Sequence, residues 1–189
     1  HNGVDINIFR PTPSEMREKL GLKDEFVIQG AADKWLNPLN RLVFNYILSN
    51  ITPDMKMVIF GCDKEQLKQL PDSVIGIGYI TDRNELVKLY SMVDVFVNVT
   101  LEDSLPTVNI EAQACGTPVI TFKSGGSPET ISERTGIVVP KGDKEGLLKA
   151  ILKIKDRGKA IYEQNCIDHV EKNFVIKDRY VEYVNLYNN

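Results

Sequence analysis

Residues 93–122 read VDVFVNVTLEDSLPTVNIEAQACGTPVITF, and this stretch decides the fold. The apolar run at 93–97 is typical of a strand that is buried on both faces. A helix of mostly small residues is predicted to begin near Pro106, and the run at 117–122 predicts another buried strand. Two buried strands joined through a helix predict a right-handed crossover between parallel strands.

The same alternation extends outward from this stretch in both directions. Further strands are expected at 26–30, 57–61, 74–77 and 137–139. Helices are expected at 40–49, 64–70, 82–91, 144–155, 158–172 and 177–187, and a short helix capped by Thr12 is expected to stop near Gly21. We therefore expect an α/β fold, a Rossmann-like open parallel sheet of about six strands with helices on both faces and extra C-terminal helices.

The composition is that of one ordinary globular domain. The chain has 189 residues, of which 42% are hydrophobic and 26% charged. Its formal net charge of -3 provides no general basic field for nucleic acid, so any anion site must be local. No apolar run approaches the roughly 20 residues that span a bilayer. Three widely spaced cysteines form no metal pattern, and we expect buried free thiols in a reducing cytoplasm.

The loop and helix at 100–118 carry the candidate site, because open parallel sheets bind ligands beyond the carboxyl ends of their strands. Free N–H groups at a helix start attract phosphates, and Ser104 and Thr107 can add hydroxyl donors. Glu111 lies about one turn into the helix, where a carboxylate needs a partner such as the two hydroxyls of a diol. The alternative is structural, in that Asp103 or Ser104 caps the helix and Glu111 pairs with a local lysine.

The same segment resembles the E-x7-E region of glycosyltransferase family 4, whose members have the GT-B fold of two facing Rossmann-like domains. Asp103 and Glu111 occupy the two acidic positions, eight residues apart. The resemblance extends over nearly the whole chain. Residues 110–120 are similar to the family's helix-to-strand signature, 124–129 to its Gly-Gly-x-Pro-Glu loop, 135–140 to a later strand, and 2–5 with 9–11 to its interdomain linker.

The resemblance implies a role for each matching position of the E-x7-E region. Glu111 would bind the ribose hydroxyls of a nucleotide. Asp103 would contact hydroxyls of the donor sugar and is the candidate catalytic residue. Backbone N–H groups near Leu105 and Thr107, with Ser104 beside them, would hold the diphosphate.

Two further loops are expected to complete the donor site. The loop that contains Tyr79 and Ile80 would lie along the base of the nucleotide. The loop after the first strand usually carries an arginine or lysine and a Lys-Gly pair in this family, whereas this chain has Leu39-Asn40 near the place of that pair. Lys34 and Arg41 are the local candidates to neutralise a leaving diphosphate.

For the protein as a whole, the resemblance implies a linker remnant at 1–12 and a C-terminal, donor-binding GT-B domain at 13–189. Such a domain binds a nucleotide-diphosphate sugar, and the intact retaining enzyme transfers a hexosyl group to a glycan or lipid-linked acceptor in polysaccharide biosynthesis. No metal or other cofactor is expected.

The missing N-terminal domain would bind the acceptor. We expect the isolated domain to be inactive, and the protein to be cytoplasmic, with peripheral association at the inner face of the membrane through that missing domain. The alternatives are a catalytically degenerate nucleotide-sugar-binding or scaffold module, a GT-B nucleotide-sugar epimerase domain, and a flavodoxin-like regulatory domain.

Overall fold

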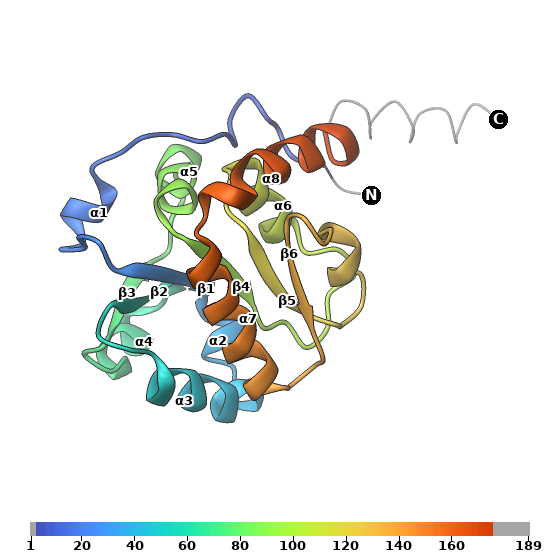
Figure 1. Ribbon diagram of the computed structural model, residues 1–189. Helices are drawn as coiled ribbons and strands as arrows, with labels where there is room; N and C mark the ends of the chain where they lie inside the picture. The colour runs from blue at the N-terminus through green and yellow to red at the C-terminus, as the bar shows by residue number, and fades with distance from the viewer. Residues whose placement is uncertain (1–2, 176–189) are drawn as a thin grey trace.

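The computed structural model describes residues 3–175 and contains one six-stranded sheet (Figure 1). All strand pairs are parallel, in the order β3-β2-β1-β4-β5-β6. The strands are β1 (Phe26–Ala31), β2 (Met55–Cys62), β3 (Val74–Gly78), β4 (Val95–Asn98), β5 (Val119–Phe122) and β6 (Gly136–Val139). The predicted Rossmann-like sheet is therefore confirmed, with each strand within a few residues of its expected place.

Helices alternate with the strands. They are α1 (Met16–Lys19), α2 (Ala32–Trp35), α3 (Arg41–Asn50), α4 (Lys64–Gln69), α5 (Arg83–Met92), α6 (Thr107–Ala114), α7 (Lys144–Arg157) and α8 (Ala160–Asn173), with short 3-10 turns η1 (Pro38–Asn40) and η2 (Ser127–Thr130). The helix expected at 177–187 lies outside the described residues. No helix in the described part of the chain is long and apolar enough to cross a membrane.

The expected Thr12 cap is wrong. The first helix begins only at Met16 and has no side-chain cap, and the Thr12 hydroxyl donates to the carbonyl of Arg10. The N–H of Thr12 donates to the Ser91 hydroxyl of α5 at 3.0 Å. This contact with a helix distant in the sequence places Thr12 beside α5, four residues before the helix. The helix ends where expected, since Gly21 has a φ of 70° that favours glycine.

The sheet is covered on both faces, and the core divides accordingly. Buried residues of α3 and α7 pack on one face together with Val95 and Val97 of β4. Phe96 points to the other face, where it packs with buried residues of α5 and α6. Helix α7 crosses in front of the strands in Figure 1, and α8 packs against α6. The three cysteines are buried free thiols, as expected.

The strand order reverses between β1 and β4, and this point locates the site. β1 pairs with β2 on one side and with β4 on the other. The connections that follow β1 and β4 therefore leave the sheet side by side at its carboxyl edge. In doubly wound folds the crevice at such a reversal is the place where ligands bind.

One buried amide in the centre of the sheet lacks a hydrogen-bond partner. Gln29 of β1 is 0% exposed, and neither its amide oxygen nor its amide nitrogen is bonded within the described part of the chain. Gln113 of α6 is equally buried, but its amide nitrogen donates to the carbonyls of Asn109 (2.9 Å) and Thr130 (2.7 Å). Burying an unpaired amide costs stability, whereas the bonded amide contributes to it.

We therefore expect Gln29→Met to raise the free energy of unfolding by about 1 kcal/mol, because the variant removes an unsatisfied polar group and keeps the volume. Urea denaturation of both proteins measures the difference. The matched variant Gln113→Met should instead lose about 1–3 kcal/mol. A loss of stability in Gln29→Met would mean that this amide binds a buried partner such as a water molecule.

Candidate functional site

The connection between β4 and α6 forms the centre of the site. The carboxylate of Asp103 accepts the N–H of Leu105 at 3.1 Å and so closes a tight turn. The residue preceding α6 is Pro106, which has no N–H, and no side chain caps the helix. The alternative that Asp103 or Ser104 caps α6 is therefore wrong.

The two predicted backbone N–H donors of this turn differ in whether they already have a hydrogen-bond partner. The N–H of Leu105 is already bonded to Asp103, so it is not free in this structure. Thr107 begins α6, and a backbone N–H in the first turn of a helix has no partner within the helix. Thr107 is half-buried and Ser104 is exposed. The start of α6 thus keeps N–H groups directed at the carboxyl edge, where they can bind an anion.

A second loop holds this turn from the other side. The N–H of Gly126 donates to the carbonyl of Asp103 at 3.0 Å. A Cβ atom on Gly125 would overlap the backbone of Asp103, and one on Gly126 would overlap that of Ser104. Only glycine allows such an approach of two backbones, so the Gly-Gly pair fixes the position of Asp103.

Buried side-chain amides join these loops below the surface. The Asn98 amide at the end of β4 donates to the Asn109 side chain of α6 at 2.9 Å, and the Asn109 amide donates to the Thr130 hydroxyl of η2 at 2.9 Å. The side-chain Oδ1 of Asn98 accepts the N–H of Thr100 at 3.1 Å. All four residues are buried, where hydrogen bonds of this kind are strong and specific in direction. They hold the loop, α6 and η2 as one unit.

Glu111 lies on α6 with a partner that the sequence did not indicate. Its Oε2 accepts the hydroxyl of Tyr90 at 3.2 Å, and Tyr90 is a fully buried residue of α5. Burial raises the pKa of Glu111, while the Tyr90 hydroxyl and the charge of Arg83 act in the opposite direction. The alternative of a local lysine partner is wrong, since the hydrogen-bonded neighbour is a neutral tyrosine.

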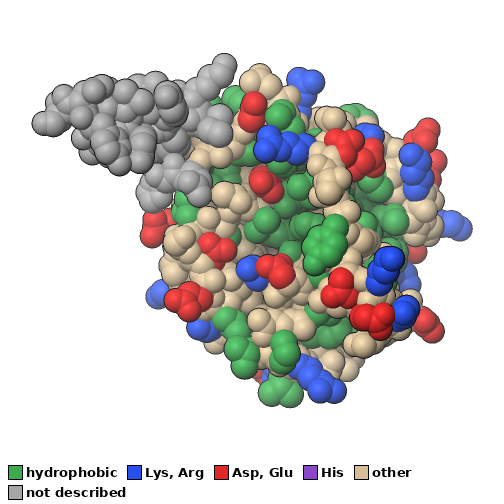
Figure 2. All heavy atoms as spheres, turned by 180° about the vertical axis from the view of Figure 1, so that it is seen from behind, with side chains coloured by type: hydrophobic (Ala, Val, Ile, Leu, Met, Phe, Trp, Pro, Cys, Tyr) green, Lys and Arg blue, Asp and Glu red, His purple; other side chains and the backbone are tan. Residues whose placement is uncertain are grey.

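The loop after β3 presents the two remaining predicted contacts. The side chain of Tyr79 is 76% exposed, and Ile80 is half-buried against the core cluster of α5. On the face shown in Figure 2, acidic and basic side chains are interspersed around a central group of hydrophobic ones. An anion approaching that face would therefore depend on local donors rather than on a broad basic surface.

The loop after β1 carries the two predicted cations in different settings. Lys34 is paired with Asp33 at 2.9 Å. The Asn40 amide donates to the carbonyls of Lys34 (2.9 Å) and Val99 (2.8 Å), so it ties this loop to the end of β4. Lys34 is thus held beside the reversal of the strand order, although its charge is engaged by a neighbour.

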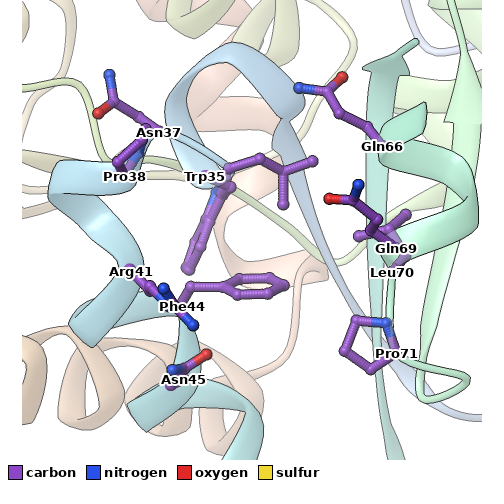
Figure 3. A pocket seen from close by; sticks show the side chains of 11 residues that line it. Trp35, Asn37, Pro38, Arg41, Phe44, Asn45, Gln66, Gln69, Leu70 and Pro71 are labelled. Atoms are coloured by element: carbon purple, nitrogen blue, oxygen red, sulfur yellow. The ribbon is translucent and has the colours of Figure 1, made fainter. Parts of the chain in front are cut away.

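Arg41 lines a separate hollow of about 470 Å³ between α3 and α4 (Figure 3). Trp35 and Phe44 meet there at a steep angle, and Gln66 and Gln69 approach from α4 (Figure 3). Phe44 belongs to the core cluster on the α3 and α7 face of the sheet, opposite to that of Tyr90. Arg41 lines this hollow and Glu111 does not.

Sequence reasoning missed Tyr90, Asn40 and Asn109. Tyr90 precedes Glu111 by 21 positions, and only the packing of α5 on α6 brings the two together. Asn40 lies near the place where the family has its Lys-Gly pair, and its side-chain amide donates a hydrogen bond to the carbonyl of Val99. An asparagine within a helix of small apolar residues, as at position 109, was the one available signal of a buried polar network.

An open six-stranded parallel sheet with helices on both faces, with the start of α6 and the half-buried Glu111 following β4, is a Rossmann-like α/β domain. The chain belongs to the family described as Glycosyl transferases group 1, whose model matches residues 19–156.

Two curated relatives illustrate the match. A D-inositol 3-phosphate glycosyltransferase of Mycobacteroides abscessus is 28% identical over 185 residues, covering 89% of this chain and 41% of the relative. An Escherichia coli protein named UDP-Gal:alpha-D-GlcNAc-diphosphoundecaprenol alpha-1,3-galactosyltransferase is 29% identical over 216 residues, covering 97% of this chain and 53% of the relative. The chain spans about half the length of these relatives.

Solved structures share the fold. Sucrose-phosphate synthase from Thermosynechococcus elongatus has a TM-score of 0.81 at 26% identity, covering 99% of this chain and 51% of that one. HepE from Anabaena has a TM-score of 0.83 at 20% identity, covering 100% and 56%. The C-terminal domain of LpcC from Francisella tularensis has a TM-score of 0.72 at 23% identity, covering 92% and 100%.

The raised pKa of Glu111 predicts how its replacement changes stability with pH. A carboxyl whose pKa is higher in the folded than in the unfolded state costs stability once it is ionised, and the cost develops as pH rises from the ordinary glutamate pKa through the raised one. We therefore expect Glu111→Gln, which keeps an acceptor for Tyr90, to be more stable than the parent near pH 7. The advantage should disappear below the ordinary pKa. Urea denaturation across pH checks this, and a variant less stable than the parent at pH 7 would contradict it.

Proposed function

We propose that residues 13–189 form the C-terminal, donor-binding domain of a retaining GT-B glycosyltransferase, with residues 1–12 as the linker into it. The observation that carries the proposal is the half-buried Glu111 carboxylate, which a neutral Tyr90 hydroxyl holds beside the open start of α6. A diol and a diphosphate of one nucleotide are the groups that such a pair of features suits.

Each part of the donor has a matching group. Glu111 would accept the two ribose hydroxyls, while the first N–H groups of α6 and the hydroxyls of Ser104 and Thr107 would bind the diphosphate. Asp103, fixed by the Gly125-Gly126 backbone, would face the hydroxyls of the donor sugar. Tyr79 and Ile80 would lie along the base.

The relatives support a nucleotide-sugar donor. The name of the E. coli relative gives UDP-galactose as its donor, and HepE was solved in complex with UDP-glucose. We extend this to a hexosyl transfer onto a glycan or lipid-linked acceptor in polysaccharide biosynthesis, without a metal cofactor. The acceptor site, and any contact with the cytoplasmic face of a membrane, would belong to an N-terminal domain, so this domain alone should not turn over.

A second candidate is a catalytically degenerate module that binds nucleotide sugars. It is favoured by the state of the cations in the described residues: Lys34 is paired with Asp33, and Arg41 lines the hollow between α3 and α4. A leaving diphosphate without a nearby cation is poorly stabilised.

Thermal-shift assays and calorimetry with UDP, GDP, ADP and their hexose conjugates test the donor site. At least one nucleoside diphosphate should raise the melting temperature by an amount that grows with its concentration, while the matching nucleoside without phosphate should not. Glu111→Gln should weaken that binding by about 1–3 kcal/mol. If none of the ligands binds, the donor-site proposal is wrong. Product analysis of the full-length protein then separates transfer from epimerisation and from an inactive module.

Asp103 should act on the sugar and not on the nucleotide. Asp103→Asn keeps an oxygen acceptor for the N–H of Leu105 but removes the charge, so the turn should survive. We expect the affinity for the nucleotide sugar to fall by about 1–3 kcal/mol, with the bare nucleoside diphosphate bound almost as by the parent. Calorimetry with both ligands measures this, and equal losses for the two would restrict Asp103 to its structural role in the turn.

Lys34 should contribute more to diphosphate binding than Arg41. Lys34 belongs to the loop that Asn40 ties to β4, whereas Arg41 lines the hollow on the other side of that loop. We expect Lys34→Ala to weaken binding of the nucleoside diphosphate by about 1 kcal/mol, Arg41→Ala to change it little, and added salt to reduce the difference. The reverse order of the two variants would place the diphosphate at the α3–α4 hollow.

A further inference from the structure

The partner of Glu111 has a property that a cation would not have. The Tyr90 hydroxyl donates one hydrogen bond to Oε2 and adds no charge. A carboxylate can accept about four hydrogen bonds, so the Oε1 atom and a remaining lone pair of Oε2 stay available. A lysine in this place would neutralise the carboxylate and compete with a ligand, whereas a tyrosine orients it and leaves its charge intact.

Tyr90 itself is fixed on three sides. Its ring lies edge-on to Phe96 of β4 (centroids 5.6 Å apart, planes at 84°) and to Phe60 of β2 (6.0 Å, 79°). The Thr117 hydroxyl, just before β5, donates to the Tyr90 carbonyl at 2.7 Å. The ring is 0% exposed, so its hydroxyl has a defined place against α6. Through Tyr90, contacts with the sheet therefore help to fix the rotamer of Glu111, in addition to the contacts of its own helix.

On this basis we propose that Tyr90 is a positioning residue for ribose recognition: it holds Oε2 of Glu111 so that the carboxylate meets both hydroxyls of the nucleotide's ribose. The inference rests on the proposed donor site and assigns to it a residue of α5 that does not touch the ligand. Tyr90 acts through Glu111, and its removal should cost affinity only where the ligand carries the ribose diol.

The charges around Glu111 predict a second readout, which is the pH below which the ribonucleotide affinity falls. From α5, the Tyr90 hydroxyl and the Arg83 charge lower the pKa of Glu111, against the larger effect of burial. At the end of α6, burial raises the pKa of Cys115 to about 12, so this thiol is neutral near pH 7. The charge of Lys159, the residue before α8, lowers the pKa of Cys115 against the larger effect of burial. Glu163 of α8 packs against Gly116, the residue after Cys115. Without the Tyr90 hydroxyl, Glu111 should protonate at a higher pH.

The test is Tyr90→Phe, with affinity measured by calorimetry for a nucleoside diphosphate that the parent binds and for its 2′,3′-dideoxy analogue. We expect about a tenfold loss for the ribonucleotide and almost no change for the dideoxy analogue. The pH below which ribonucleotide affinity falls should move upward in Tyr90→Phe. Tyr162→Phe, which alters a buried tyrosine of α8, is the matched control and should bind both ligands like the parent.

A second variant covers the case in which Tyr90→Phe is too unstable to assay. Thr117→Val removes the hydroxyl that donates to the Tyr90 carbonyl and leaves both Tyr90 and Glu111 in place, so it should show the same selective loss in smaller measure. In the Glu111→Gln background, Tyr90→Phe should cause little further loss of ribonucleotide affinity.

Three results are distinguishable. The positioning role is overturned if Tyr90→Phe binds the ribonucleotide like the parent and its affinity falls below the same pH. Equal losses for the ribonucleotide and its dideoxy analogue assign Tyr90 to the fold alone and also overturn it. A parent that binds no nucleoside diphosphate overturns the proposed donor site, and this inference falls with it.

Discussion

The hydrogen bond between the side chains of Asn98 and Asn109 is the contact on which the site depends. It joins the last residue of β4 to the first turn of α6, across the loop that connects the two. Asn109 continues to Thr130, so the loop after β5 is tied to the same point. With these anchors buried and paired, the turn at Asp103 and the start of α6 are held in place by the fold itself.

The charge distribution of the site follows from these buried contacts. The partners of its acidic groups are neutral: the Leu105 N–H for Asp103 and the Tyr90 hydroxyl for Glu111. An anion would meet helix N–H groups first, since Lys34 is engaged by Asp33. Burial raises the pKa of Glu111 and so costs folding free energy once this carboxyl is ionised.

The sequence predicts the architecture well, because buried parallel strands read as apolar runs and each is followed by a helix. All six predicted strands lie within a few residues of their expected places. One error concerns a contact between distant segments and the other a contact within a single turn. Thr12 resembles a helix cap locally, but its N–H bonds to Ser91. Leu105 resembles a free donor, but the Asp103 beside it in the same turn takes its N–H.

The partner of Glu111 could not be read from the sequence, because α5 and α6 are separated by β4 and meet only after folding. The resemblance to a family nevertheless marked Glu111 itself. Physical reasoning from the residues supplied the need for a partner, and the structure supplied its identity. A half-buried acidic residue in a predicted helix is therefore best treated as one member of a pair whose other member lies on a neighbouring element.

The central proposal is that the donor nucleotide binds at the carboxyl edge, between the start of α6 and the loop after β3. Amide chemical-shift mapping of the ¹⁵N-labelled chain during titration with a bound nucleoside diphosphate tests it directly. We expect the perturbed amides to belong to residues 78–81 and 103–111. Perturbations concentrated instead at 41–45 and 66–71, around the hollow between α3 and α4, would contradict it.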